Sequence, residues 1–449
     1  MRWSALMMVI LALLWIVPVG AQQTVTLTAW TIGPEEASRT RATNLVEAAQ
    51  RLNKALEEEK APYRVSVETS FETTNWDTHR RRILLAFQSG KAPDIVQAAH
   101  IDVAPWSDAG YIIPLDPYLD KYPSFKDVIP TLWNAVKYKG KIWGVPQDTE
   151  ARPFYFNKEL LAKLGWSAAD IAALPRMIRE GKFTWQDVLK VGKEAVDRGV
   201  VARGYGYWHR PVRGPDFYHF YYNFGGRLQD PRTGQLIFTQ AAALEMFRFF
   251  DEMATQGVIR RDLIGTPWPV WHRTITDGRV LFWSAGTWSW AEWATQYVKD
   301  RGGYEYLWPR FGFALQPASA PGRKPITLSQ PMAYMVWSGS RQKDLAVRLL
   351  SFVLTPELDT KHAVGSAHLA VLKSTTKYGP YVKDRFLRQV TYMLNYTTFQ
   401  PVHPRFGQYD EIFFRALSAV EAGRVRPEEA VRIVADELRA TLRDQVIIE

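Results

Sequence analysis

A short polar stretch in the first half of the chain holds side chains that could do chemistry. Asp148, Glu150 and Arg152 stand between a Gly-Val-Pro break at 144–146 and the aromatic run Phe154-Tyr155-Phe156. Charged groups are costly to bury without partners, and they form strong hydrogen bonds with the polar groups of a ligand. The stretch therefore predicts a ligand site.

Asp148 and Glu150 also suggest a second interpretation, a secreted glycoside hydrolase that works with a pair of carboxyl groups. Two acids two positions apart on a strand face opposite ways, so the pair suits hydrogen bonding better than catalysis. Ser340 and Lys343 match Ser-x-x-Lys by spacing alone, and the common metalloprotease, phosphate-loop and nucleophile-elbow patterns do not occur. We therefore expect no catalytic residue, no cofactor and no metal ligand.

The polar residues lie in a stretch, Tyr138 to Gly165, that predicts a passage of the chain from one lobe to another. Gly140 favours a hairpin between Tyr138 and Ile142, and Asn157 stands where a helix N-cap is expected. Gly165 provides the C-terminal stop of that helix. A strand therefore delivers the polar groups, and a helix carries the chain away from them.

Alternating strands and helices precede this passage. The pattern predicts strands at 25–30 and 63–71 with an amphipathic helix between them, which implies a parallel sheet. Ligands bind beyond the carboxyl ends of such strands. That edge is expected to present Trp30, Glu35, Glu36, Thr74 and Trp76.

A third strand, Ile95-Val96, follows Pro93 and is expected to release His100 and Asp102 at the same edge. Both residues have alternative interpretations. Asp102 is also of a residue type that commonly forms the N-cap of a helix, here the helix that follows it. His100 could equally be a hydrogen-bonded core or surface histidine.

Aromatic residues are dense in the second half of the chain. The stretch 205–226 predicts a core helix at 217–224, preceded by a loop in which Trp208 and Arg210 face a ligand. A buried strand after residue 279 opens into Gly286-Thr287-Trp288. Aromatic rings fill hydrophobic cores, and the apolar faces of sugars also stack on them.

Several of these patterns together resemble the extracellular carbohydrate-binding proteins of bacterial ABC importers, the maltose- and trehalose-binding group. The likeness rests on Asn157-Lys158, Pro93-Asp94, Gly286-x-Trp288 and Pro356-Glu357 with the elements around them, and it covers nearly the whole mature chain. It implies an α/β fold of two lobes, each a mainly parallel sheet flanked by helices, with several chain crossings at a hinge. The expected boundaries are 22–148 with 327–372 for the first lobe, and 149–326 with 373–449 for the second.

The resemblance further implies that the protein captures a mono- or oligosaccharide by hinge closure and delivers it to a membrane permease. Glu150 matches an acidic hydroxyl-binding residue, Asp102 the acid after the Pro-Asp strand, Trp288 a stacking ring, and Arg405 a cation that faces the cleft. The expected ligand-binding residues are Trp30, Glu35, Glu36, Thr74, Trp76, His100, Asp102, Asp148, Glu150, Trp208, Arg210, Gly286, Trp288, Gln330, His368, Arg405 and Tyr409.

The same fold is also compatible with a different class of solute. Arg152, Arg210 or Arg405 could hold a phosphorylated polyol or another anion through charge-assisted hydrogen bonds. Arginine binds sugar hydroxyls as well, and the acidic neighbours Asp148 and Glu150 favour a neutral sugar.

Composition supports an exported, folded protein of more than one lobe. The 449 residues are 47% hydrophobic and 23% charged, and the formal charge of +10 is spread among acids, which argues against nucleic acid as a partner. Arg2, an apolar run and small residues up to Ala21 predict a cleaved signal peptide at 1–21. The chain has no cysteine, so we expect no lipid anchor and a periplasmic or otherwise extracytoplasmic monomer.

Overall fold

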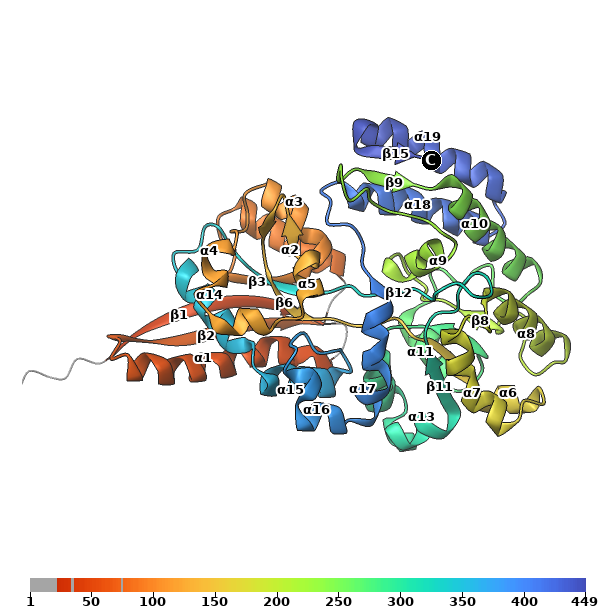
Figure 1. The fold of residues 1–449 in the computed structure, drawn as a ribbon, viewed down its shortest axis with the longest axis horizontal. Coiled ribbons are helices and arrows are strands. Elements are labelled where there is room, and N and C mark those ends of the chain that lie inside the picture. Colours follow the sequence, from red (N-terminus) through yellow and green to blue (C-terminus); the bar gives the residue numbers. More distant parts are fainter. Residues whose placement is uncertain (1–21, 34–35, 74–75) are drawn as a thin grey trace, which may run out of the picture.

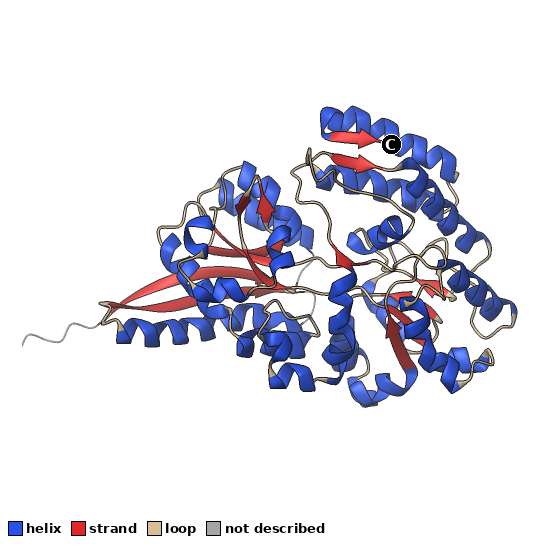
Figure 2. Cartoon of the chain, viewed as in Figure 1, coloured by secondary structure: helices blue, strands red, loops and turns tan. Residues whose placement is uncertain are grey.

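The computed structural model describes residues 22–33, 36–73 and 76–449, which form two lobes side by side (Figure 1). The predicted signal peptide and two predicted site residues, Glu35 and Thr74, lie outside the described residues. Within the described chain, every helix is too short or too polar to cross a membrane. In both lobes the strands lie inside and the helices cover them (Figure 2).

A five-stranded sheet with the order β2-β1-β3-β13-β6 forms the centre of the first lobe. β1 (Gln23–Ile32) pairs in parallel with β2 (Tyr63–Glu72) and β3 (Ile95–Ala99), as the sequence predicts. β13 (Met332–Val336) runs antiparallel to both β3 and β6 (Val145–Asp148). It does so because the chain enters β13 from the other lobe, at the edge where β1 and β3 end.

Amphipathic helices cover this sheet. α1 (Thr40–Glu58) buries Leu45, Ala49, Leu52 and Leu56, so the predicted apolar face is confirmed. The other helices that pack in or beside this lobe are α2 (Trp76–Gln88), α3 (Val103–Asp108), α4 (Asp116–Leu119), α5 (Pro130–Ala135), α14 (Lys343–Val353), α15 (Pro356–Ser366) and α16 (Gly379–Lys383).

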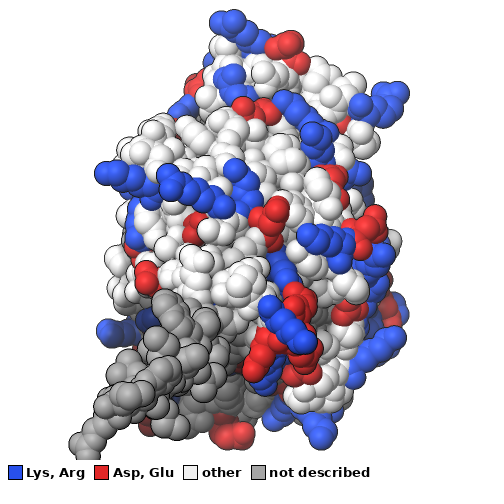
Figure 3. Space-filling view, turned by 90° about the vertical axis from the view of Figure 1, so that its left-hand side faces the viewer, with Lys and Arg blue, Asp and Glu red and all other residues white. Residues whose placement is uncertain are grey.

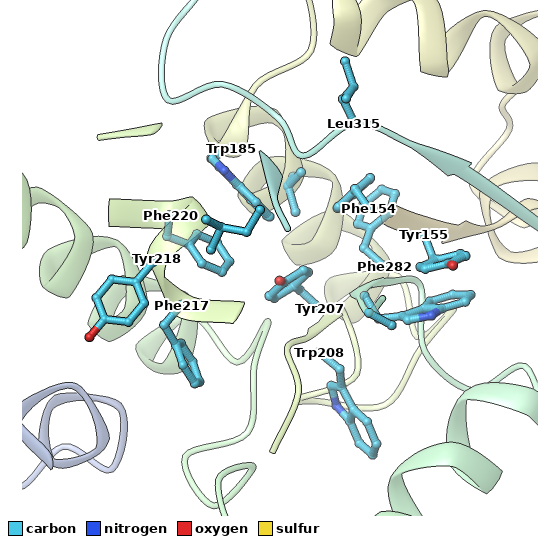
Figure 4. Packing of buried hydrophobic residues seen from close by; sticks show 14 of the residues in the cluster. Phe154, Tyr155, Trp185, Tyr207, Trp208, Phe217, Tyr218, Phe220, Phe282 and Leu315 are labelled. Atoms are coloured by element: carbon cyan, nitrogen blue, oxygen red, sulfur yellow. The ribbon is translucent and has the colours of Figure 1, made fainter. Parts of the chain in front are cut away.

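A four-stranded sheet, β11-β7-β10-β8, forms the centre of the second lobe. β7 (Phe154–Asn157) is antiparallel to β10 (Phe282–Ser284) and β11 (Phe311–Ala314), and β8 (Tyr207–Trp208) is parallel to β10. Aromatic rings fill the core around this sheet (Figure 4), so most of the aromatic content serves packing.

Helices of several lengths surround the second sheet. They are α6 (Lys158–Lys163), α7 (Ala168–Arg179), α8 (Trp185–Asp197), α9 (Tyr218–Asn223), α10 (Gln240–Thr255), α11 (Trp268–Thr276), α12 (Ser289–Glu292), α13 (Tyr304–Arg310), α17 (Arg385–Val390), α18 (Phe406–Glu421) and α19 (Pro427–Leu442). Short strand pairs complete the fold: β4 (Lys137–Tyr138) with β5 (Lys141–Ile142), β12 (Thr327–Leu328) with β14 (Thr397–Thr398), and β9 (Leu236–Phe238) with β15 (Val446–Ile448).

Capping side chains begin two helices, and the first of these caps is the predicted one. The side chain of Asn157 accepts a hydrogen bond from the backbone N–H of Leu160 at 3.1 Å, which makes it the N-cap of α6. The backbone N–H of Thr184 donates to Asp187 Oδ2 at 2.8 Å at the start of α8. Gly165 follows α6 with a φ of 95°, which favours glycine.

Segments that pass between the lobes lie beside one another. The backbone N–H of Leu369 donates to Thr149 O at 2.7 Å, and that of Ser329 donates to Thr398 O at 2.8 Å. The hydroxyl oxygens of Thr149 and Ser329 are 2.6 Å apart. Separate hydrophobic clusters fill the two lobes. These crossing segments therefore join two cores that could move relative to each other.

Candidate functional site

A buried ion pair lies where the first crossing leaves β6. Asp148 Oδ2 accepts hydrogen bonds from Arg41 Nε at 3.0 Å and Nη2 at 2.7 Å, and His362 Nε2 lies 2.9 Å from the same oxygen. Burial opposes ionisation of Asp148, but the Arg41 guanidinium and the hydrogen bond with His362 outweigh it and hold the pKa of the carboxyl well below its usual value. Asp148 is therefore a charged partner of α1 and α15.

His368 continues this network toward the second lobe. Its Nε2 lies 3.2 Å from Arg41 Nη2, and its Nδ1 lies 2.9 Å from the hydroxyl of Ser366. Because a guanidinium can only donate, His368 Nε2 accepts, and the proton sits on Nδ1. Burial lowers the pKa of His368 well below its usual value, which keeps the ring neutral.

A second buried network belongs to the other lobe. Arg152 Nη1 and Arg210 Nη1 bind the two oxygens of Asp216, at 2.6 Å and 2.9 Å. Arg152 Nη2 also lies 3.2 Å from Glu150 Oε1, which accepts the backbone N–H of Gln330 at 2.7 Å. Burial opposes ionisation of Asp216, but the two arginines lower its pKa to about 2.

Glu150 behaves differently from Asp216. Burial raises its pKa to about 8, because Arg152 offsets only part of the desolvation. At neutral pH the two guanidiniums of Arg152 and Arg210 thus face one carboxylate and a carboxyl group that is mostly protonated. The cluster carries a net positive charge and a neutral donor.

Trp288 lies between the two networks. Its ring stacks on His368 with centroids 5.7 Å apart and 14° between the planes. The guanidinium carbons of Arg152 and Arg210 lie 4.6 Å and 5.2 Å from its ring centre. A Cβ at Gly286 would come within 1.9 Å of the Trp288 ring, so glycine is needed there to leave room for the indole. Trp288 is only 8% exposed, and a solute can stack on it only after one of these neighbours moves away.

The geometry of two lobes joined by crossings, with charged and aromatic side chains gathered beside them, agrees with the sequence comparisons. The family model of the bacterial extracellular solute-binding proteins matches residues 42–359. The chain belongs to this family.

One relative of this solute-binding protein is a binding protein of Brucella abortus (strain 2308), 21% identical over 377 residues, which are 83% of this chain and 85% of that protein. Solved structures share the fold at a similar or lower sequence identity to this chain. An ABC transporter solute-binding protein of Thermotoga lettingae bound with α-D-tagatose has a TM-score of 0.72 at 22% identity, over 92% of this chain and 99% of that one. A maltose-bound protein of T. maritima has a TM-score of 0.73 at 17% identity, over 92% and 99%.

The structure brings many of the predicted site residues of this solute-binding protein to the crossings. Those that take part in the two networks or contact Trp288 are Asp148, Glu150, Arg210, Gly286, Gln330 and His368. Trp76 lies beside them, with its ring 5.9 Å from the Arg41 guanidinium carbon.

Other predicted residues of the first lobe lie farther out and have partners of their own. Asp102 accepts hydrogen bonds from Arg80, at 2.5 Å from Nε and 3.2 Å from Nη2. The Trp30 ring lies under Arg82, and Glu36 pairs with Arg39 on the surface. His100 is fully buried, and its Nε2 lies 3.0 Å from Gln400 O, so it is the hydrogen-bonded core histidine of the alternative interpretation.

Three predicted residues of the second lobe lie away from the crossings, which corrects their predicted placement. Trp208 is fully buried in the core (Figure 4), where its Nε1 donates to Gly204 O at 2.8 Å. Tyr409 is also fully buried, and its hydroxyl donates to Ile237 O at 3.0 Å. Arg405 extends toward the end of α19, with Nη2 3.0 Å from Thr441 O.

Sequence reasoning missed four residues of the site: Arg41, Asp216, Trp268 and His362. Arg41 looks like a solvated residue in the first turn of a helix, yet it is 1% exposed. Trp268 is half-buried and lies 4.7 Å from the Arg210 guanidinium carbon, so Arg210 lies against Trp268 and Trp288. The dense aromatic stretch at 205–226 was the available signal for Asp216, but nothing in it singled out the acid.

Asp148, His362 and His368 place one ligand atom each within 4.8 Å of one another, which is compatible with a metal ion. Arg41, however, donates to both Asp148 and His368, and the other ring nitrogen of His362 lies 2.7 Å from Thr40 Oγ1. A divalent cation would stand beside the guanidinium and displace it. The donor set therefore fits the arginine better than a metal.

A separate cavity of about 1320 Å³ opens between parts of both lobes. None of the predicted site residues that the structure describes lines it. Its walls come mainly from residues 137–140, 226–235 and 398–404. Its rim carries cations and anions together, including Lys139, which pairs with Asp108 at 2.5 Å. This cavity is distinct from the buried cluster around Trp288.

Proposed function

We propose that this solute-binding protein is the substrate-binding component of an ABC sugar importer. It would capture a mono- or oligosaccharide by hinge closure and deliver it to a membrane permease without chemical change. The observation that carries the proposal is the cluster of Glu150, Arg152, Arg210 and Trp288 beside segments that cross between two separate cores. Carboxyl and guanidinium groups bind hydroxyls, and an indole face binds the apolar side of a sugar ring.

The lobe boundaries belong to the same proposal. The first lobe would comprise 22–148 and 327–372, and the second 149–326 and 373–449. Burial supports most of this division, because the apolar residues at 27–145, 333–358 and 371–372 cluster together and those at 151–328 and 381–446 cluster separately. The buried residues Ala363, Ala367, Leu369 and Ala370 pack with the second core, so the last boundary lies within a segment shared by both lobes. Movement would then be concentrated in the short segments between these ranges.

The solutes of similar proteins favour a saccharide. Structures with the same fold hold α-D-tagatose and maltose. The net positive charge around Arg152 and Arg210 is compatible with an anionic sugar derivative, whereas Asp216 provides an acceptor and Glu150 a donor for hydroxyl groups. A neutral sugar uses both kinds of group, so we place it first.

A thermal-shift screen tests the proposed function. Mono- and oligosaccharides, with phosphorylated polyols as a separate set, are added to the purified protein, and each compound is recovered afterwards. A solute at about 100 times its dissociation constant stabilises the folded state by about 2.7 kcal/mol, which raises the melting temperature by a few degrees. Recovery of intact sugar supports binding, steady release of reducing ends supports a hydrolase, and a response only to phosphorylated polyols supports the anionic solute.

A variant pair shows whether the response comes from the proposed site. Arg210→Met removes a guanidinium that contacts Trp288 and Asp216, and it should reduce the saccharide-induced shift. Arg248→Met is the control, because Arg248 pairs with Glu428 on the surface of the same lobe. Equal shifts in the two variants would remove Arg210 from the site.

Export is the remaining part of the proposal. The protein would be cleaved near Ala21 and act outside the cytoplasm as a monomer. Mass spectrometry of the protein from its natural source should show a mature N-terminus near Gln22. Retention of residues 1–17 in the mature protein would contradict this part while leaving the binding proposal intact.

A further inference from the structure

A loop of the second lobe reaches the first lobe at α2. Arg213, between β8 and α9, has Nη2 3.9 Å from Asp77 Oδ2 at the start of α2. The same guanidinium has Nε 3.6 Å from Asp410 Oδ2 and Nη1 4.0 Å from Glu411 Oε2, both on α18 of its own lobe. One side chain therefore contacts charged groups of both lobes.

Each end of this contact is anchored within its lobe. In the first lobe, Arg80 Nη1 lies 3.1 Å from Asp77 Oδ1, and Arg80 also binds Asp102. In the second lobe, the Tyr218 hydroxyl donates to Asp410 Oδ1 at 2.9 Å. The charges alternate in sign along Asp102, Arg80, Asp77, Arg213 and Asp410. This alternation favours the observed order of contacts over any arrangement that brings like charges together.

Only the step from Arg213 to Asp77 in this chain of charges passes from one lobe to the other. Separation of the lobes would break that step and leave Arg213 with Asp410 and Glu411. The side chains of Arg213 and Asp77 are 38% and 57% exposed, so water and salt weaken their attraction. The contact therefore suits a reversible link better than a permanent one.

We propose that Arg213 is a positioning residue for closure, which holds the second lobe against Asp77 of the first and favours the closed form without touching the solute. Asp102, expected from the sequence to bind the ligand, instead anchors the first-lobe end of this link through Arg80. The proposal goes beyond solute binding, because it concerns the balance between open and closed forms of the unliganded protein. It holds whichever solute the site takes.

The absence of cysteine from the chain makes the test direct. Lys91→Cys and Arg424→Cys place one spin label on an exposed position of each lobe, and pulsed electron paramagnetic resonance gives the distribution of distances between them without solute. The labelled protein is compared with Arg213→Gln, Asp77→Asn and the double variant. Arg248→Gln is the control, since Arg248 and Glu428 form an exposed ion pair within the second lobe.

We expect each single variant to lower the ratio of closed to open protein by about two- to fivefold, as for an exposed ion pair. The double variant should show no further loss, because either substitution already removes the link. Raising the salt to about 1 M should bring the unmodified protein to the same ratio as the variants, since screening then acts over about 3 Å.

Two results would overturn the proposal. One is a distance distribution for Arg213→Gln that matches that of Arg248→Gln. The other is a loss in the double variant equal to the sum of the single losses, which would mean that the two side chains act independently. Circular dichroism checks folding, and the salt series on the unsubstituted chain remains informative if a variant does not fold. None of these readings depends on sugar, so they stay separate from the test of solute binding.

Discussion

Trp288 shows how one residue can serve both packing and binding. The sequence suggests a free stacking ring, whereas the structure places the indole between His368 and Arg152. His368 comes from a crossing segment and Arg152 from the start of the second lobe. A change in the angle between the lobes would therefore uncover one face of the ring more readily than a change within either lobe.

Glu150 is expected to make stability depend on pH. Its pKa of about 8 in the folded protein lies above the ordinary 4.5, so the folded state keeps a proton that the unfolded state releases between these values. Stability contributed by the protonated form is present below the ordinary pKa and is lost as the pH rises through about 8. Glu150→Gln should match the unmodified protein near pH 4.5 and exceed its free energy of unfolding by up to about 3–5 kcal/mol at pH 9.

Urea unfolding at the two pH values measures this difference. Glu429→Gln on the exposed side of α19 is the control and should follow the unmodified protein at both. An equal stability of Glu150→Gln and the unmodified protein at pH 9 would mean that Glu150 is ionised at little cost.

Gly286→Ala tests the position of the Trp288 ring. The new Cβ would lie 1.9–2.2 Å from ring carbons of Trp288, so the indole has to leave its place between His368 and the arginines. Overpacking of this kind costs about 1–3 kcal/mol. We expect a lower melting temperature and at least about tenfold weaker sugar binding by calorimetry. Gly407→Ala in α18 meets no atom within 4 Å and should change neither quantity.

At the scale of elements, the ion pair of Arg41 and Asp148 ties α1 to β6, and His362 adds α15. Asp148→Asn would leave the Arg41 guanidinium buried without an anion, at a cost of about 3–5 kcal/mol in the free energy of unfolding. The double variant Arg41→Met, Asp148→Leu should lose less, because it removes both charges. Asp300→Asn, on the surface, is the control for chemical denaturation. A single variant as stable as this control would mean that Arg41 finds another partner.

The pH dependence of that ion pair has the opposite sign to that of Glu150. The pKa of Asp148 is held below its ordinary value, so its contribution is present above the ordinary pKa and is lost as the pH falls through the folded value. The difference between Asp148→Asn and the unmodified protein should therefore persist at neutral and alkaline pH, and shrink only in acid.

Local chemistry made most elements predictable. The start of α6 at Asn157, the apolar face of α1 and the parallel β1–β3 pairing follow from caps and periodicity. The antiparallel entry of β13 does not, because it depends on where the chain returns from the other lobe. Arg41 and Asp216 were missed for the same reason, since their partners are far away in the sequence and a charged residue on its own indicates a solvated surface.

The distribution of surface charge agrees with the sequence, in which basic residues are spread among acidic ones. Lys and Arg are interspersed with Asp and Glu on the face at the end of the first lobe (Figure 3). Because anions are interspersed among the cations, the surface gives little long-range attraction for a polyanion, in spite of the formal charge of +10. At the scale of the whole molecule, the informative charges are the buried ones beside the crossings.

Hydrogen exchange with and without a bound saccharide can decide whether the solute binds beside Trp288 or in the separate cavity. A solute beside Trp288 would bring the lobes together at the crossings, so amides in 286–290 and 362–372 should exchange more slowly, while the interior of α19 should not change. The cavity of about 1320 Å³ makes a contrasting prediction, because its wall includes 226–235. Slower exchange at 226–235 with no change at 286–290 would move the solute to that cavity. Protection is expected at segments from both lobes around Trp288. A ligand that contacts both lobes binds the closed form more tightly than the open form, and this difference in binding free energy drives closure.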